Sequence, residues 1–209
     1  MTDTVQFYTN PMSRGQIVRW MLEEAGAPYE AHILDYQTTM KAPAYLAINP
    51  MGKVPAIVHR GKAVTECAAI CAYLADVFPA AGLAPTDDER ADYYRWLFFA
   101  AGPVEAAVTN RAAGFAVAPE RERMVGYGNY ETAMAALETG VTGRDFICGA
   151  RFTAADVYVG SQIDWGLQFK TIPDRPAFAA YAERLRQRPA YRRAKEIDNT
   201  LIAAAQGAG

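Results

Sequence analysis

The N-terminal part of the chain alternates between the apolar patterns of strands and of helices. Val5–Tyr8 combines β-branched and aromatic residues, which is typical of a short strand. Asn10-Pro11 punctuates the chain, and Ser13 then stands where it can cap a helix. The next apolar residues share one helical face: Ile17, Val18, Met21 and Leu22. Gly26 ends this helix, so the pattern predicts a strand followed by a helix.

Three further strands and a closing helix are expected before residue 80. Residues 30–34 and 54–59 have strand character, and Arg60-Gly61 makes a two-residue turn into a short strand at 62–64. The segment AVTECAAICAYLADVF that ends at Phe78 is typical of a helix. Because the first strand–helix–strand unit requires parallel pairing and the tight turn requires antiparallel pairing, we predict a mixed four-stranded sheet.

Beyond residue 78 the sequence indicates helices alone. Residues 79–90 have the character of a linker, and apolar positions recur at helical spacing from Tyr93 onward. Pro103 is expected to kink the resulting helix. A further helix is predicted to run from Pro119 toward Gly140.

The last third of the chain carries helix start signals. Thr153 and Asp156 have the spacing of a capping box, in which the threonine bonds free helix amides and the aspartate reaches back. Pro176 and Pro189 stand where the first turn of a helix can begin. The arginine-rich segment 183–195 is interpreted as a solvated helix face.

The composition narrows the class of protein. The chain has 209 residues, 51% of them hydrophobic, which suits one large domain or two small ones. A net charge of -2 gives no electrostatic reason to bind nucleic acid or an anionic membrane. No apolar run approaches a membrane span, and the N-terminus lacks the features of a signal peptide. Three cysteines do not make a disulfide framework, so we expect a cytoplasmic protein with free thiols.

The two histidines give no sign of a metal centre. His32 and His59 fall on different predicted strands, and neither has a cysteine or carboxylate at ligand spacing. We interpret both as structural and expect no metal cofactor.

Three other stretches can carry chemistry, and the first is Asn49–Pro55. Two prolines and a glycine crowd the entrance to a strand there. A cis Val54–Pro55 bond would bring the backbone of Val54 out of the sheet, where an extended peptide-like ligand can pair with it. An ordinary edge-strand turn explains the same residues.

The second stretch, Thr65-Glu66-Cys67, places a carboxylate at the start of an apolar helix. The unpaired amides and partial positive charge of a helix N-terminus favour a ligand carboxylate. Glu66 is also placed to receive an ammonium group, so together they can hold the head group of an α-amino acid. The alternative is that Glu66 only complements the helix dipole.

The third stretch, Tyr8–Gly15, places a phenol, a hydroxyl and a guanidinium between a strand end and a helix start. Ligands of open α/β sheets gather at such strand ends. A thiol brought there can be held as thiolate by a hydroxyl donor and helix amides. The alternative gives Ser13 a capping role alone and places Tyr8 in the core.

In this order and spacing, the three stretches and the all-helical half that follows resemble the cytosolic glutathione transferases. The resemblance covers nearly the whole chain and rests on NPMGKVPAI followed by VTECAAICAYLAD, on YTNPMSRGQIVRWMLEEAGAPYE and on FTAADVYVG. It implies a thioredoxin-like α/β domain over residues 1–80 and an all-α domain over residues 87–209, which carries part of the electrophile site. It also implies glutathione as cosubstrate, a hydrophobic electrophile as second substrate and a homodimer.

The resemblance assigns roles by matching position. Pro55 corresponds to the family's cis-proline, and Val54 to the residue whose backbone pairs with the cysteinyl part of glutathione. Glu66 corresponds to the ligand of the γ-glutamyl ammonium and Cys67 to a ligand of the γ-glutamyl carboxylate. Lys53 corresponds to a position that can reach the glycine carboxylate.

Two positions depart from the family pattern. The family usually has Ser or Thr where this chain has Cys67, and a thiol is a weaker donor than a hydroxyl. Cys67 is therefore expected to weaken glutathione binding or, alternatively, to be redox-active. Near the first strand end members use Tyr, Ser or Cys; this chain offers Tyr8 and Ser13 but no cysteine. We favour Ser13 over Tyr8 as the donor that holds the thiolate, with Arg14 adding positive potential.

The expected function is thus that of a glutathione transferase, a detoxification enzyme that adds the glutathione thiolate to electrophilic small molecules. One alternative is a glutathione-dependent disulfide reductase or isomerase. The other is a non-catalytic binding module that keeps the fold, since a fold does not fix a function.

Overall fold

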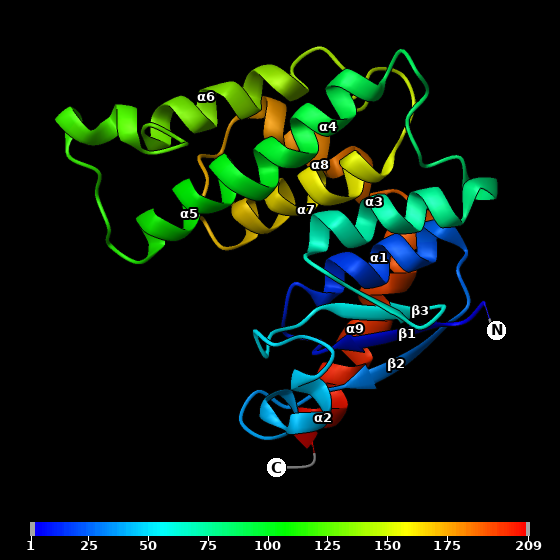
Figure 1. Cartoon of the computed structure of the whole chain (residues 1–209). Coiled ribbons are helices and arrows are strands. Elements are labelled where there is room, and N and C mark those ends of the chain that lie inside the picture. Colours follow the sequence, from blue (N-terminus) through cyan, green and yellow to red (C-terminus); the bar gives the residue numbers. More distant parts are fainter. Residues whose placement is uncertain (1–2, 208–209) are drawn as a thin grey trace. The chain divides into compact units, whose positions relative to one another are not determined.

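The computed structural model describes residues 3–207, which form two compact units. Unit 1 contains the described residues of 1–84 and 187–209, and unit 2 contains residues 85–186. The elements of unit 1 are β1 (Val5–Thr9), α1 (Gly15–Ala25), β2 (Tyr29–Ile33), η1 (Thr39–Lys41), α2 (Pro43–Leu46), β3 (Ala56–His59), β4 (Lys62–Thr65), α3 (Cys67–Val77), η2 (Pro79–Ala81) and α9 (Pro189–Gly207). Those of unit 2 are α4 (Arg90–Phe99), η3 (Ala100–Val104), α5 (Glu105–Ala112), η4 (Pro119–Met124), α6 (Tyr130–Val141), α7 (Ala154–Gln168) and α8 (Pro176–Arg186) (Figure 1).

The strands described in unit 1 form one four-stranded sheet in the order β2-β1-β3-β4. β1 pairs in parallel with β2, with Phe7 opposite Ala31, and antiparallel with β3, with Phe7 opposite Ile57. Arg60 and Gly61 connect β3 to β4 with φ angles of 51° and 76°, and a tight two-residue hairpin turn requires such positive values. The predicted mixed sheet is confirmed.

Different helices cover the two faces of this sheet. α1 and α3 lie against one face and α2 against the other (Figure 1). Phe7 is fully buried on the α1 side, where the Arg19 guanidinium carbon lies 5.3 Å from its ring centroid. Tyr8 points to the opposite face and packs against the buried cluster that contains Tyr45. Successive side chains of a strand alternate between faces, so β1 contributes to both layers.

Helix α9 and Arg188, the residue directly before it, are joined to α1 by ion pairs. Arg188 donates from Nε and Nη2 to the two carboxylate oxygens of Glu24, at 2.6 and 2.7 Å. Arg193 donates from Nε to Glu23 at 3.1 Å. The interpretation of residues 183–195 as a solvated helix face is therefore corrected at Arg188, whose side chain is 29% exposed, whereas the Arg193 side chain is 54% exposed. The periodicity of one helix could not reveal that α1, far away in the sequence, supplies their carboxylates.

The predicted domain division, at residues 80 and 87, stays a prediction. The boundary between the compact units on this side of the chain lies between residues 84 and 85. The second boundary, between residues 186 and 187, arises because α9 lies with α1 in unit 1.

In unit 2, α4, η3 and α5 follow one another without interruption. Pro103 lies inside η3, which is a π-helical turn. A π-turn is a local widening of an α-helix, so the helix is widened at Pro103 and does not end there, and the kink expected at this proline stays a prediction.

The helix predicted from Pro119 does not run through to Gly140. Residues 119–124 form the 3-10 helix η4, and α6 begins only at Tyr130. The Asn129 side chain caps α6 by accepting a hydrogen bond from the Thr132 amide at 2.9 Å. The prediction was wrong because two glycines and this cap stop the pattern between η4 and α6.

The predicted capping box is present at the start of α7. The Thr153 amide donates to Asp156 Oδ2 at 2.8 Å. Asp156 is buried, and its Oδ1 accepts from the Tyr181 hydroxyl at 2.6 Å and from the Ile147 amide at 2.7 Å. This one carboxylate therefore ties α7 to α8 and to the preceding loop. None of the helices among residues 3–207 has the length and apolar character needed to cross a membrane.

Candidate functional site

The loop between β1 and α1 is closed around the Ser13 hydroxyl. This hydroxyl donates to the carbonyl of Asn10 at 2.6 Å, and its oxygen accepts from the amide of Gly15 at 2.9 Å. Ser13 therefore satisfies one of the unpaired amides at the start of α1, as the sequence predicted. The side chain remains half-buried at this helix N-terminus.

Gly15 and Asn10 hold this loop in place. A Cβ atom on Gly15 would lie 1.9 Å from Thr9 Oγ1, so only glycine fits where α1 begins. Asn10 donates from Nδ2 to the carbonyl of Leu34 at 2.8 Å and accepts at Oδ1 from the amide of Met12 at 2.9 Å. In the sequence, Asn10-Pro11 indicates only a break between strand and helix, so this positioning role of Asn10 was not predicted.

The segment before β3 is held in place by hydrogen bonds from nearby side chains. The Val54–Pro55 peptide bond is cis, as predicted. Tyr45 Oη and Asn49 Nδ2 both donate to the carbonyl of Lys53, at 2.6 and 2.7 Å. The Lys53 side chain is exposed, and Val54 lies before the first residue of β3, outside the strand ladder.

Lys41 was not singled out from the sequence. Its Nζ donates to the carbonyl of Gly52 at 2.7 Å. Gly52 lies two residues before Val54. Gly52 has a φ of 57°, and a Cβ there would lie 3.0 Å from a Leu46 methyl group. The glycine in NPMGKVP is therefore required by its backbone, and a lysine near the end of η1 secures it.

Glu66 stands in an unfavourable backbone conformation directly before α3. Its φ is 65° and its ψ is 117°, and its side chain is exposed. A non-glycine residue held in a sparsely populated region costs roughly 1–3 kcal/mol, and such residues concentrate at functional sites. The structure thus maintains a carboxylate at this helix start against a backbone preference.

Cys67 is the first residue of α3 and is 8% exposed. Its thiol lies 3.6 Å from the carbonyl oxygen of Arg14 as a weak hydrogen-bond donor. This contact brings the start of α3 next to the loop that carries Ser13. Cys71, one turn further on, is fully buried, and burial raises the pKa of its thiol well above the ordinary value.

Tyr8 lies in different surroundings from Ser13. Its ring stacks on His32 with a centroid distance of 4.7 Å and an interplanar angle of 20°, and Tyr45 lies 5.6 Å away. These contacts are on the face of the sheet opposite to α1. Of the two candidate hydroxyls, only that of Ser13 lies in the loop that Cys67 contacts.

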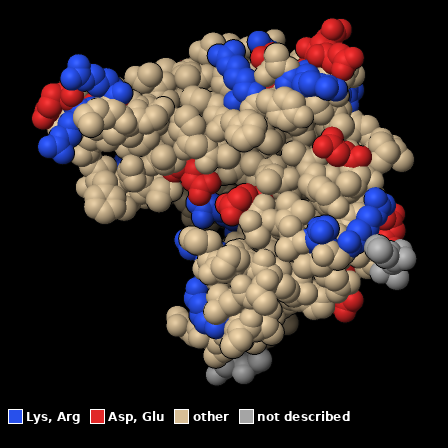
Figure 2. Space-filling model, viewed as in Figure 1, with Lys and Arg blue, Asp and Glu red and all other residues tan. Residues whose placement is uncertain are grey.

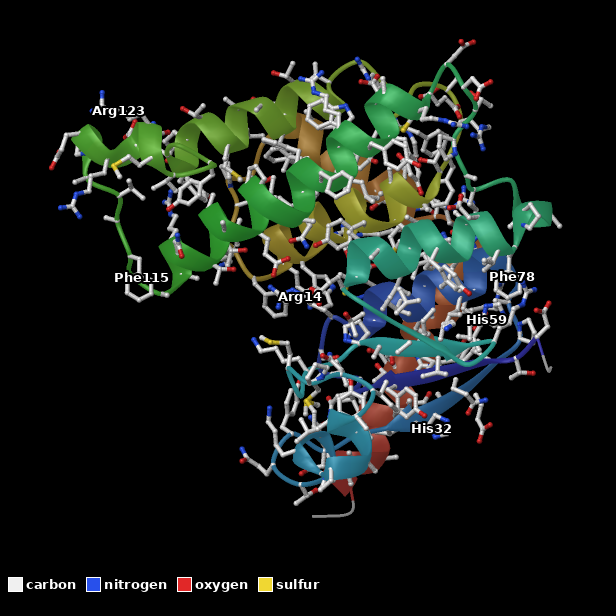
Figure 3. The ribbon with its side chains drawn as sticks, in the orientation of Figure 1. Arg14, His32, His59, Phe78, Phe115 and Arg123 are labelled. Atoms are coloured by element: carbon white, nitrogen blue, oxygen red, sulfur yellow. The ribbon has the colours of Figure 1, made fainter. Side chains whose placement is uncertain are left out.

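Both histidines have structural partners. His59 is buried, stacks on Phe78 and shares a hydrogen bond of 2.9 Å with the Tyr73 hydroxyl. His32 shares one of 2.7 Å with Gln6. Figure 3 shows His59 and Phe78 together, well away from Arg14 at the start of α1. Among residues 3–207 there is no group of three or more metal-ligating side chains that could hold an ion.

Exposed apolar side chains flank the candidate site, another feature that the sequence analysis missed. Met12 directly precedes Ser13, and the Tyr36 hydroxyl donates to the Met12 carbonyl at 3.1 Å. Met51 is exposed in the turn before Lys53. Isolated exposed apolar residues are common, but these three adjoin the segments described above.

The chain is similar to proteins of known family in both sequence and structure. Residues 12–77 match the family described as "Glutathione S-transferase, N-terminal domain". The chain is 31% identical over 170 residues to Glutathione S-transferase GST-4.5 of Xanthomonas campestris, an alignment that covers 77% of this chain and 82% of that protein. A solved sphingomonad glutathione S-transferase complexed with glutathione is 30% identical, with a TM-score of 0.74 over 93% of this chain and 98% of the other.

A second solved structure is the glutathione transferase of Methylococcus capsulatus. It is 28% identical, with a TM-score of 0.75 over 94% of this chain and 99% of the other. The coverage extends across both units. The expected fold class, a thioredoxin-like α/β part followed by helices, is therefore confirmed.

Proposed function

Because the chain belongs to the glutathione S-transferase family, we propose that it is an enzyme that binds glutathione on unit 1. It adds the glutathione thiolate to electrophilic carbon atoms of hydrophobic small molecules. The observation that carries this proposal is the conformation of Glu66, a carboxylate kept at the start of α3 with a φ of 65°. Such strain is retained where a ligand needs the group in that place.

The γ-glutamyl head group is held at the start of α3. Its carboxylate receives hydrogen bonds from the first amides of the helix, beginning at Cys67, and the helix dipole favours its charge. Its ammonium pairs with Glu66, which is exposed and within reach of a ligand. This arrangement is supported by the sphingomonad relative, whose structure contains bound glutathione.

The rest of the tripeptide runs past the cis-proline. The backbone of Val54 exchanges hydrogen bonds with the cysteinyl residue, as an added strand would. The cis bond to Pro55 and the bonds that fix the Lys53 carbonyl prepare this backbone for pairing. The exposed Lys53 ammonium attracts the glycine carboxylate.

Ser13 holds the thiolate. Its hydroxyl turns from the Asn10 carbonyl to the glutathione sulfur, while the Gly15 amide still donates to its oxygen and polarises it. A hydrogen bond to the charged form stabilises the thiolate and lowers the pKa of the bound thiol. A sulfur lone pair then forms the new carbon–sulfur bond, and the leaving group departs with the electrons of the bond that breaks. The exposed guanidinium of Arg14 adds positive potential.

A non-catalytic binding module is the second candidate. The observation in its favour is Cys67, which places a thiol beside the γ-glutamyl head group where the family usually has a hydroxyl. A disulfide reductase has less support, because the segment 8–15 contains no cysteine that could form a mixed disulfide.

We extend the proposal to a cytoplasmic homodimer with a role in detoxification. Tyr94 and Phe98 lie one turn apart on α4, and Phe98 is 68% exposed. Their ring centroids lie 6.5 Å apart, and contiguous exposed apolar side chains mark interaction surfaces. Phe98→Glu should therefore convert a dimer into a monomer in analytical ultracentrifugation. A wild-type protein that sediments as a monomer would contradict the homodimer.

Calorimetric titration of reduced glutathione is the direct test of the proposed site. Wild-type protein should bind with a Kd between micromolar and millimolar, and Glu66→Ala should bind at least tenfold more weakly. Glu30→Ala, which removes an exposed carboxylate from β2, is the matched control and should bind normally. Equal binding by both variants would overturn the assignment of the head-group site.

A conjugation assay separates the two candidate functions. Turnover of glutathione with an aromatic halide such as chlorodinitrobenzene supports the transferase. Normal glutathione binding without turnover of a panel of halides, epoxides and enones supports the binding module.

A further inference from the structure

Unit 2 carries a cavity of about 630 Å³, open to solvent, that has no part in the proposed chemistry. It lies where the end of α5, the loop 113–118, η4 and the start of α6 meet. Figure 3 labels Phe115 on the loop and Arg123 on η4 at this end of the unit. Small-molecule sites commonly occupy 300–1,000 Å³, so the cavity has room for a ligand of several rings.

Aromatic rings form its apolar walls: Phe115, Tyr127 and Tyr130. The Tyr130 hydroxyl donates to the carbonyl of Thr171 at 2.8 Å, and the Tyr127 hydroxyl accepts from Asn110 Nδ2 at 3.0 Å. The phenol groups are therefore engaged elsewhere, and the rings contribute mainly their apolar surface. Phe115 is 70% exposed, although a large aromatic side chain is normally covered. These walls suit a flat aromatic ligand.

Two carboxylates of the cavity, those of Glu122 and Glu131, can accept further hydrogen bonds. Glu122 Oε2 accepts from Asn129 Nδ2 at 2.9 Å, and Glu131 Oε1 accepts from Arg111 Nη1 at 3.2 Å. Each of these two carboxylates also has a second oxygen, and a carboxylate oxygen can accept more than one hydrogen bond. The cavity therefore offers acceptors to a ligand that carries N–H donors.

The charges point the same way. Two carboxylates, Glu122 and Glu131, line the cavity together with one guanidinium, that of Arg111. The Arg111 guanidinium lies 4.0 Å from the centroid of the Tyr130 ring and is paired with Glu131. Outside the lining, charged side chains of both signs lie at this end of the unit, at the left of Figure 2, where η4 carries Arg121 and Arg123 beside Glu120 and Glu122. The net charge of the lining favours a cation over an anion.

We propose that this cavity is a second ligand site that binds a planar aromatic molecule carrying a positive charge or N–H donors. The ring lies among Phe115, Tyr127 and Tyr130, and the donors meet the carboxylates of Glu122 and Glu131. None of the residues assigned to glutathione belongs to this site, so it does not depend on the proposed function.

The test is calorimetric titration with proflavine, a planar aromatic cation, using the whole chain. Wild-type protein should bind it with a micromolar Kd. Ala116→Trp fills the cavity from an exposed loop position and should weaken binding at least tenfold. Ala113→Trp adds the same ring to an exposed residue that does not line the cavity, and should bind as wild type does.

A second pair of variants tests the role of charge. Glu122→Gln keeps the size of the side chain and removes its charge, so proflavine binding should weaken roughly fivefold. Glu120→Gln makes the same change on η4 outside the cavity lining and should have no effect. Thermal unfolding of each variant verifies that it is folded.

Three results would overturn the proposal. One is unchanged proflavine binding by Ala116→Trp that is folded. Another is equally tight binding of the anionic dye anilinonaphthalenesulfonate, which would remove the preference for cations. The third is displacement of proflavine by S-hexylglutathione, which would place the dye in the glutathione or electrophile site. Persistence of proflavine binding in Glu66→Ala supports an independent site, whether or not glutathione binds.

Discussion

Arg19 on α1 and Asp198 on α9 form a buried ion pair across 179 positions of sequence. Arg19 Nε donates to Asp198 Oδ1 at 2.8 Å, and each residue is 1% exposed. Arg19 also reaches the Tyr29 hydroxyl at 3.3 Å. Within the described chain, Arg19 Nη2 and Asp198 Oδ2 have no hydrogen-bond partner. The pair therefore joins the two helices but leaves part of its polar surface unsatisfied.

Asp198→Ala should destabilise unit 1 by about 3–5 kcal/mol, because it leaves the Arg19 charge buried without its partner. The double variant Arg19→Met/Asp198→Leu should recover most of that loss, since it removes both charges and restores apolar volume. Urea unfolding of the two variants measures the difference. If the double variant is no more stable than Asp198→Ala, this account of the pair is wrong.

Glu66→Gly should be about 1 kcal/mol more stable than Glu66→Ala. Both changes remove the carboxylate, but only glycine adopts a φ of 65° without steric cost. Chemical denaturation of both variants gives this difference in stability. Both variants should bind the glutathione head group weakly, because neither has the carboxylate. Equal stability of the two would mean that the backbone at this position stores no strain.

Ser13→Ala should raise the pKa of the bound glutathione thiol and lower kcat on the order of a hundredfold. Tyr8→Phe should leave that pKa close to the wild-type value, because the Tyr8 ring packs against His32 on the other face of the sheet. The ultraviolet absorbance of the bound thiolate, measured as a function of pH, gives the pKa of the bound glutathione thiol directly. The reverse pattern would transfer the role from Ser13 to Tyr8.

Cys67→Ser should tighten glutathione binding roughly fivefold, because a hydroxyl is a better hydrogen-bond donor to a carboxylate than a thiol is. Cys71→Ala is the matched control. Its thiol is fully buried one turn further along α3, so its removal should affect stability and not affinity. Calorimetric titration of both variants measures the effect, and unchanged affinity in Cys67→Ser would assign the head-group carboxylate to backbone amides alone.

The pH dependence of stability should reveal the ion pair at the start of α4. The guanidinium of Arg151 hydrogen-bonds Glu89 and holds the pKa of this carboxyl below its ordinary value. Because the folded state then binds the proton less tightly than the unfolded state, the contribution is present above pH 4.5, the ordinary glutamate value. It is lost as the pH falls through the lowered pKa.

Urea midpoints between pH 7 and about pH 3 measure this contribution. The stability difference between wild type and Glu89→Gln should shrink as the pH falls. Arg151→Met should remove the same pH dependence, because it removes the cation of the ion pair. A difference that stays constant over this range would rule out Glu89 as its source.

Local patterns predicted the elements whose signals are complete within a few residues. The mixed sheet and the capping box of Thr153 follow from short motifs, whereas the cis Val54–Pro55 bond was implied by the family resemblance. The helix predicted from Pro119 failed because apolar spacing continued across a break that glycines and the Asn129 cap determine. The positive φ of Glu66 also had no sequence signal, because positive φ angles are usual for glycine and uncommon for glutamate.

Contacts between distant segments were the part that could not be predicted. Asn10 donates to the carbonyl of Leu34, and Arg188, directly before α9, donates to Glu24 on α1. A single sequence records residue types and spacing, but it does not record which surfaces meet. The preference for Ser13 over Tyr8 came from a resemblance, and the packing of Tyr8 on the far face of the sheet supplies a physical reason for it.

Helix α9 packs on α1 but is synthesised last, after all of unit 2. Residues 189–207 leave the ribosome only after all of unit 2 has been made, so the nascent sheet and α1 wait for their last helix. During that interval Arg19 has no Asp198, and the carboxylates of Glu23 and Glu24 have no arginines. A chain interrupted before α9 would leave these charges uncompensated. The buried pair can therefore form only after translation has passed residue 198.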